Sequence, residues 1–142
     1  MNPRIAVVGS VNMDLVFRTS RMPAIGETIE GKEFHQIPGG KGANQAVAAA
    51  RQGAQVCFVA SVGSDGFGEQ SLHGFADEGI DLSHVFRATG TPTGTAGIIV
   101  DDSGHNCIVI AAGANALLSP AHVQAAADAI GSAQMLVCQL ET

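Results

Sequence analysis

The chain has 142 residues, of which 46% are apolar, and this is enough to bury a hydrophobic core in one domain. Seven basic and thirteen acidic residues give a net charge of −6 without a basic cluster, so we expect no nucleic-acid partner. The longest apolar stretches have the length of strands, and the first residues lack the apolar core of a signal peptide. We therefore expect a soluble, cytoplasmic protein without a membrane partner.

In chain order, strands and helices alternate along most of the sequence. Short apolar runs predict buried strands, and alanine-rich or amphipathic segments that end in glycine predict helices. The expected elements are a strand at 5–9, a helix at 42–52, a strand at 56–62, a helix at 66–78, a helix from 119 to about 130 and a buried strand at 135–140. This order is typical of an α/β fold with a mostly parallel sheet and covering helices.

Two insertions depart from this alternation. The segment 15–37 is too long for an ordinary loop between a strand and a helix, and it contains β-prone pieces. The segment 93–112 predicts a hairpin, because two β-prone arms flank a turn at 101–104. We interpret the two insertions as one small β-sheet lid over the carboxyl edge of the main sheet, where open α/β folds bind ligands.

Cysteines and histidines give no sign of a metal or redox site. Cys57, Cys107 and Cys138 are widely separated, and each lies in an apolar run, which predicts buried, reduced thiols on strands. The five histidines are scattered, and none has ligand spacing with a carboxylate or a thiol. We therefore expect no structural metal.

The most informative segment is 39–46, which reads GGKGANQA and leads into the first expected helix. Glycines let a ligand approach the backbone closely, and the free amides of a helix start favour phosphate or hydroxyl oxygens. The segment is no Walker A loop, because Gly42 stands where Ser or Thr is required, and no dinucleotide fingerprint, because Gln45 replaces the third glycine. As a bare glycine-rich loop, the pattern leaves a ligand loop and an ordinary helix start both open.

A polar pair follows the first strand. Asn12 and Asp14 are two residues apart, so that their side chains can face the same way. An amide and a carboxylate together can hold vicinal hydroxyls. An Asx turn at the end of the strand is the other interpretation, and the local sequence does not decide between the two.

Over essentially its whole length the chain resembles the ribokinase family of carbohydrate kinases. The segment 39–63 carries its glycines and Asn44 at the family's spacing, and GSVNMD at 9–14, AGAN at 112–115 and QLE at 139–141 are also similar. The resemblance implies a three-layer α/β/α fold with a mostly parallel central sheet and a β-sheet lid. Residues 1–142 would form the N-terminal part of this single domain, with lid insertions at about 15–37 and 93–112, and the ATP-binding half would be absent.

The resemblance implies a kinase that transfers the γ-phosphoryl group of ATP to O5 of D-ribose, with magnesium and a monovalent cation such as K⁺. The family's Gly-Ala-Gly-Asp run, which supplies the catalytic base, does not occur in this chain. We therefore expect no catalytic, cofactor-binding or metal residue here, and no phosphoryl transfer by this chain alone. Deoxyribose, a related sugar or a nucleoside are alternative acceptors, and a stand-alone sugar-binding module is a third reading.

Family similarity also implies how the sugar would be held. Asp14, with Asn12 beside it, would bind ring hydroxyls, Gly40 would offer its backbone amide, and Glu141 would reach the sugar from the last strand. The residues expected to bind the sugar are Asn12, Asp14, Gly39, Gly40, Lys41, Asn44 and Glu141.

The expected hairpin at 93–112 is apolar on both faces. One face is expected to close over the sugar, and the other to meet a second lid. Family members similar to this chain dimerise through such lids, so we expect a two-fold homodimer that is joined near Ile98, Val100 and Ile108.

Overall fold

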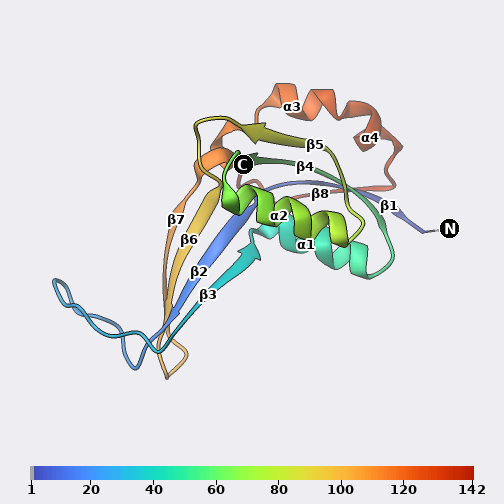
Figure 1. The fold of residues 1–142 in the computed structure, drawn as a ribbon. Coiled ribbons are helices and arrows are strands. Elements are labelled where there is room, and N and C mark those ends of the chain that lie inside the picture. Colours follow the sequence, from blue (N-terminus) through green and yellow to red (C-terminus); the bar gives the residue numbers. More distant parts are fainter. Residues whose placement is uncertain (1) are drawn as a thin grey trace.

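The computed structural model describes residues 2–142, which form a body of sheet and helices from which a second sheet projects (Figure 1). The body contains a sheet of four parallel strands, here called the main sheet, in the order β5-β4-β1-β8. Its strands are β1 (Arg4–Val8), β4 (Gln55–Gly63), β5 (Asp81–Ala88) and β8 (Met135–Cys138). β1 therefore lies inside the main sheet, between β4 and β8, as the short apolar sequence of this strand predicts.

The projecting sheet, here called the lid sheet, combines the two insertions. Its strands are β2 (Asn12–Arg18), β3 (Glu33–Gly39), β6 (Gly94–Val100) and β7 (Asn106–Ala111), in the order β3-β2-β6-β7. β2 pairs with β6 in parallel, and the two outer pairs are antiparallel. The prediction that both insertions build one small sheet is confirmed.

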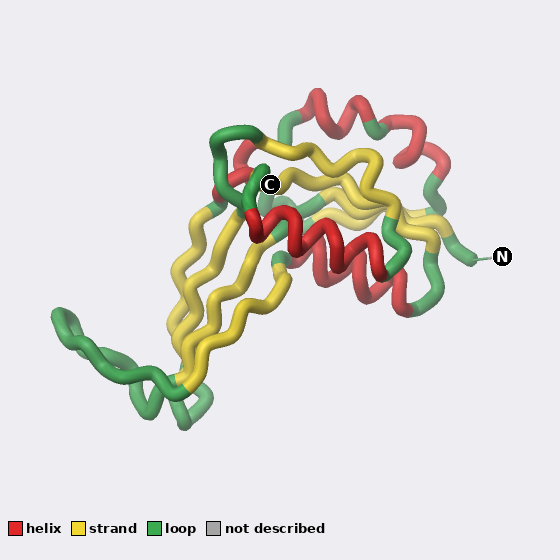
Figure 2. The backbone as a smooth tube through the Cα atoms, viewed as in Figure 1, coloured by secondary structure: helices red, strands yellow, loops and turns green. Residues whose placement is uncertain are grey.

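Helices cover both faces of the main sheet (Figure 2). α1 (Lys41–Arg51) and α2 (Gly66–Asp77) pack on one face, and the short helices α3 (Pro120–Ala125) and α4 (Ala127–Ser132) lie on the other. A 3₁₀ helix, η1 (Gly113–Leu117), connects the lid sheet to α3. This arrangement confirms the expected α/β fold with three layers. None of the helices formed by residues 2–142 is long and apolar enough to span a bilayer.

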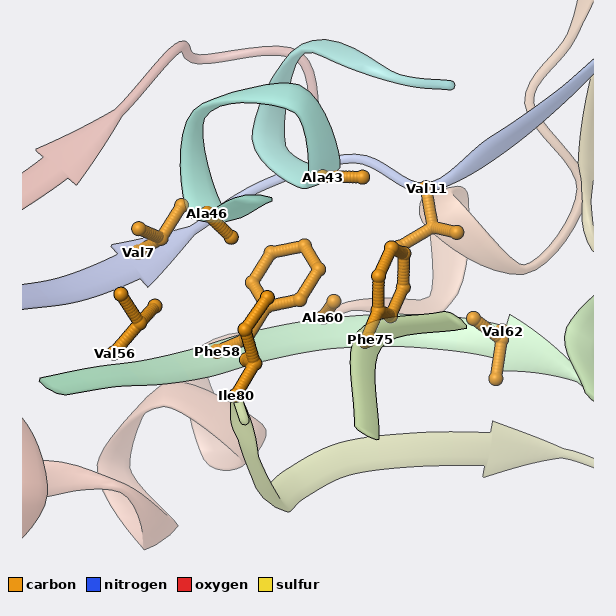
Figure 3. Close-up of a cluster of buried hydrophobic side chains, with 10 residues drawn as sticks. All are labelled: Val7, Val11, Ala43, Ala46, Val56, Phe58, Ala60, Val62, Phe75 and Ile80. Carbon is orange, nitrogen blue, oxygen red and sulfur yellow. The ribbon is translucent and has the colours of Figure 1, made fainter. Parts of the chain in front are cut away.

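The core lies between the main sheet and the pair α1 and α2 (Figure 3). Phe58 of β4 and Phe75 of α2 meet edge to face with their ring centroids 5.6 Å apart, and Phe58 is fully buried. Ala46 lets α1 approach the sheet closely, next to Val7 of β1. Truncation of an aromatic ring in such a core costs about 3–5 kcal/mol, so Phe58 is a major source of stability for this layer.

Both helices of this layer end as the sequence predicts, and α2 begins at a side-chain cap. Gly53 and Gly79 follow α1 and α2 with φ of 87° and 71°, a backbone conformation that glycine adopts without strain. Asp65 is the N-cap of α2, and its Oδ1 accepts a hydrogen bond of 2.8 Å from the amide of Gly68.

The structure differs from the predictions in three elements. β5 was not predicted, because its polar residues Asp81, Ser83 and His84 interrupt the apolar pattern of a buried strand. The helix expected from 119 to about 130 is broken at Ala126 into α3 and α4. β8 is an edge strand, so Met135 is 58% exposed and the strand is not buried as its apolar sequence suggested.

The expectation for the cysteines is wrong in part. All three thiols are free, but Cys107 and Cys138 are exposed and Cys57 is half-buried. Cys107 lies on β7 and Cys138 on β8, and both strands are edges of their sheets. An apolar run at a sheet edge therefore does not bury its cysteine. Partial burial raises the pKa of the Cys57 thiol.

Candidate functional site

The chain segment between β1 and β2 meets the start of α1, and this contact requires glycine. Gly40, the N-cap of α1, has φ of 94°, and a β-carbon there would lie 2.7 Å from the carbonyl oxygen of Ser10. A β-carbon at Gly42 would lie 2.5 Å from the carbonyl carbon of Gly9. The amide of Ala43 donates to the Ser10 carbonyl oxygen at 3.0 Å. These two glycines thus serve the close packing of the chain against itself, a role that the sequence did not reveal.

Asn12 and Asp14 lie on one face of the lid sheet, directly beside this loop. In the register of β2 and β3, Asn12 is opposite Gly39 and Asp14 is opposite Ile37. A side chain at Gly39 would collide with the Asp14 carboxylate. The predicted common orientation of Asn12 and Asp14 is therefore confirmed, and it is β2, rather than an Asx turn, that holds them.

The Asp14 carboxylate is half-buried, and this changes its acidity. Partial burial raises the pKa of Asp14 above its ordinary value of 3.8, because the charged form loses part of its hydration. Its side-chain oxygens are strong acceptors for hydroxyl groups, which would replace the lost water. The carboxylate thus suits a polyhydroxylated ligand.

Lys41 and Glu141 form a second group of candidate residues. Lys41 is the first residue of α1, Glu141 lies just after β8, and the Lys41 ammonium pairs with the Glu141 carboxylate. The side chains are 68% and 39% exposed, so the pair contributes little to stability and both groups remain accessible to a ligand. The peptide that joins Gly40 to Lys41 connects this pair to the residues of the lid sheet.

Asn44 lies one turn farther along α1 and is exposed. Its backbone amide donates to the Gly40 carbonyl oxygen at 2.9 Å, which closes the first turn of the helix. Its side chain lines a cavity of about 660 Å³ between α1, α2 and the end of β3. Of the seven expected residues, Asn12, Asp14, Gly39 and Gly40 form one compact group, Lys41 and Glu141 a pair beside it, and Asn44 lies at its border.

The sequence alone assigned no role to two polar residues of this region. Asn115 of η1 is only 3% exposed, and its side chain bonds to the backbone of Val11 and to Asn12. Gln139 lies against Gly9, and its Nε2 donates to the Oε1 of Gln45 on α1. Both belong to stretches that resemble the ribokinase family, and this resemblance was the one signal that could have directed attention to them.

The lid sheet also places the apolar residues expected to join a dimer. Asp14 is in register with Ala96, so Ile98 and Val100 share the Asp14 face, and Ile108 is opposite Ile98. The residues expected to join a second lid therefore lie on the same face as Asp14, and not on the face opposite to it. Val109 lies on the other face and is 71% exposed.

Within residues 2–142, no group of three or more His, Cys, Asp or Glu residues is arranged to hold a metal ion.

Comparison with known proteins identifies the fold and the family. Residues 2–139 match the family described as pfkB family carbohydrate kinase. The chain is 46% identical over 137 residues to the ribokinase of Mus musculus and 41% identical over 137 residues to the deoxyribokinase of Salmonella typhi. It is 32% identical to the solved structure of Arabidopsis thaliana ribokinase complexed with ribose and ATP, with a TM-score of 0.83.

Each match covers nearly all of this chain but less than half of the relative. The chain is covered to 96%, 96% and 99%, but it spans only 42% of the mouse protein, 45% of the Salmonella protein and 46% of the Arabidopsis chain. It therefore corresponds to somewhat less than half of each of these relatives. The match along residues 2–139 shows that the chain belongs to the pfkB family of carbohydrate kinases.

Proposed function

We propose that the protein is a kinase that transfers the γ-phosphoryl group of ATP to O5 of D-ribose, and that the chain described above binds the sugar. The observation that supports this most directly is the compact group in which Asn12 and Asp14 face the glycine loop at the start of α1. A relative with the same arrangement of chain was solved with ribose and ATP. Residues 1–142 are then the N-terminal part of one ribokinase-like domain.

In this proposal each polar group holds one part of the sugar. The Asp14 carboxylate accepts from two ring hydroxyls, and the Asn12 amide binds a neighbouring oxygen. The amide of Gly40, at the positive end of α1, donates to another sugar oxygen. Lys41, Asn44 and Glu141 bind the remaining hydroxyls, and the Lys41–Glu141 pair opens to do so.

Phosphoryl transfer depends on positioning and on the stabilisation of charge on the moving group. The contribution of this chain is to hold the ribose so that O5 points toward the nucleotide. We assign to the rest of the domain the binding of ATP, magnesium and a monovalent cation such as K⁺, together with the catalytic base. The chain of residues 1–142 alone is therefore expected to transfer no phosphate.

A deoxyribokinase is the second candidate, because a protein of that name is 41% identical to this chain. The two sugars differ only in the 2-hydroxyl group, so the distinction depends on whether a protein group needs this hydroxyl as a partner. Loss of such a partner leaves a polar group unsatisfied and costs affinity. Calorimetry of the full-length protein with D-ribose and with 2-deoxy-D-ribose, and a coupled ADP-release assay with each sugar, separates the candidates.

The variant Asp14→Ala tests the sugar site itself. We expect it to weaken the binding of ribose to the full-length protein by about 1.5–3 kcal/mol, the contribution of hydrogen bonds to a charged group. ATP affinity should stay unchanged. Asp128→Ala is the matched control, because Asp128 is an exposed carboxylate in the first turn of α4. An unchanged ribose affinity of Asp14→Ala would remove Asp14 from the site, and the absence of sugar-dependent ADP release would contradict the proposed function.

The proposal includes a two-fold homodimer formed by lid sheets. Ile108 and Ile110 are 50% and 64% exposed on the Asp14 face, and contact with a second lid would cover them. The same face would then enclose the sugar and join the two protomers.

A further inference from the structure

Asn115 is a buried amide at the point where the lid sheet joins the main body. It lies in η1, directly after β7, and it is 3% exposed. Its Oδ1 accepts from the backbone amide of Val11 at 2.8 Å, and its Nδ2 donates at 2.9 Å both to the Val11 carbonyl oxygen and to Oδ1 of Asn12. A buried amide with three satisfied hydrogen bonds is costly to rearrange.

These bonds determine which end of the Asn12 amide remains free. The Val11 backbone amide can only donate, so Asn115 must present its oxygen there and its nitrogen on the other side. Both protons of that nitrogen are used by the Val11 carbonyl and by Asn12. Asn12 must therefore turn its oxygen toward Asn115, which leaves its Nδ2 protons for a ligand.

Gly94 makes room for this pair of amides. A β-carbon at position 94 would lie 2.8 Å from the Val11 carbonyl oxygen and would collide with both Asn115 Nδ2 and Asn12 Oδ1. Gly94 is also opposite Asn12 in the register of β2 and β6. Three segments that are far apart in the sequence thus meet around the side chain of Asn115. They are the β1–β2 junction, the start of β6 and η1.

We propose that Asn115 is a positioning residue for sugar binding, which fixes the Asn12 side chain so that its amide donates to an acceptor oxygen of the sugar. The inference rests on the proposed function in so far as the ligand is a sugar. It adds that the oxygen next to Asn12 is recognised as an acceptor, because the Asn12 oxygen is already engaged.

A double-mutant cycle in the full-length protein tests whether Asn115 acts through Asn12. Asn115→Ala is expected to weaken ribose binding roughly tenfold, because the Asn12 amide then loses its fixed orientation. In the Asn12→Ala background the same substitution should change the ribose Kd less than twofold. ATP affinity should be unchanged in all variants, and Asn2→Ala, at an exposed asparagine before β1 and outside the lid sheet, is the matched control.

An equal loss of ribose affinity in both backgrounds would show that Asn115 has only a structural role, and this would overturn the proposal. Asn115→Asp is the second variant, because it keeps the shape and the acceptor for the Val11 amide but removes the two donors. It should lose ribose affinity as Asn115→Ala does, and wild-type ribose affinity in Asn115→Asp would equally contradict the proposal.

Hydrogen exchange of side-chain amides gives a readout that needs no variant. In the wild-type protein without sugar, both Nδ2 protons of Asn115 should exchange slowly and those of Asn12 rapidly, with Asn2 as the exposed reference. Ribose should slow the Asn12 protons. If Asn115 exchanges as fast as Asn2, or if Asn12 is already protected without sugar, the inference fails. If no pentose binds the wild-type protein, the proposed function fails, and the sugar-free exchange rates still decide the orientation of Asn12.

Discussion

The carboxylate of Asp14 occupies the space where a β-carbon at position 39 would lie. Gly39 is the last residue of β3 and is buried, whereas the left-handed backbone at the start of α1 belongs to Gly40. Glycine is therefore required at positions 39 and 40 for two different physical reasons. Gly40 permits the turn into α1, and Gly39 makes room for the carboxylate that is proposed to bind the sugar.

The variant Gly39→Ala tests this relationship. Its methyl group should displace the Asp14 carboxylate and weaken ribose binding at least tenfold, as loss of a hydrogen bond to a charged group would. Gly74→Ala is the matched control, since a β-carbon at Gly74 in α2 meets no atom within 4 Å. Calorimetry with ribose and with ATP measures both affinities. Wild-type ribose affinity in Gly39→Ala would show that Asp14 can bind the sugar from another position.

A second prediction concerns the cost of holding Asp14 partly buried. Burial raises its pKa in the folded state, so deprotonation at neutral pH opposes folding, and the stability that protonation confers is lost as the pH rises through the folded pKa. Asp14→Asn removes this cost. We expect it to raise the melting temperature at neutral pH, and the gain should vanish below the ordinary carboxyl pKa of 3.8, where Asp14 is protonated in both states.

Thermal melts of the full-length protein across this pH range measure the effect. Asp77→Asn is the control, because Asp77 is an exposed carboxylate at the end of α2 whose side chain is 70% exposed. A loss of melting temperature in Asp14→Asn at neutral pH would mean that the carboxylate stabilises the fold. Asp14 would then be a structural group, and not one that is held partly buried at a cost in stability for ligand binding.

The main sheet was largely predictable because β1 and β4 are short apolar runs that β-structure buries on both faces. β5 escaped prediction because it is an edge strand whose polar residues Asp81, Ser83 and His84 interrupt its apolar ones. The break at Ala126 also escaped, since alanine on both sides favours one continuous helix. In the structure α3 contacts β5 whereas α4 contacts β1, so the two parts of the broken helix pack on different strands.

Within the candidate site, the arrangement of residues that are close in sequence was predictable, and that of distant residues was not. Asn12 and Asp14 are close in sequence, and the spacing of two on a strand is enough to orient them together. The contact between Lys41 and Glu141 joins positions 100 residues apart, which local patterns do not encode. Asn115 is a further case, because a buried asparagine in a small-residue stretch shows its role only when its three partners are known.

A third prediction concerns Asp65, which joins α2 to the segment before β6. It accepts from the Gly68 amide at 2.8 Å, and from the amide and the hydroxyl of Thr93 at 2.8 and 2.6 Å. Burial alone would raise the pKa of Asp65, but these hydrogen bonds outweigh it and hold the pKa below its ordinary value of 3.8. Asp65→Ala should cost about 1–2 kcal/mol of stability, as loss of a helix N-cap does.

Because the folded pKa of Asp65 is lowered, its stabilising effect is present above the ordinary pKa and is lost as the pH falls through the folded value. The difference in unfolding free energy between wild type and Asp65→Ala should therefore shrink below about pH 4, in the range of the carboxyl pKa. Denaturant titrations of the full-length protein at several pH values measure it, with Asp77→Ala at the other end of α2 as control. A difference that persists unchanged in acid would assign the loss to packing instead of the carboxylate.

The last prediction concerns the proposed dimer and uses two neighbours on β7. Ile108 lies on the Asp14 face of the lid sheet, and Val109 lies on the opposite face. They are 50% and 71% exposed, so lysine at either position is solvated in a monomer. In a dimer joined through the Asp14 face, Ile108→Lys buries a charge without a partner, which should weaken association roughly a hundredfold or more.

Val109→Lys should leave the dimer intact, because the lysine remains in water on the outer face. Sedimentation velocity of the full-length protein over a concentration series measures both dissociation constants. If the Asp14 face also encloses the sugar, Ile108→Lys should weaken ribose binding together with dimerisation, and Val109→Lys should change neither. Dissociation caused by Val109→Lys but not by Ile108→Lys would place the contact on the opposite face, and the sugar site and the protomer interface would then be separate surfaces of the lid.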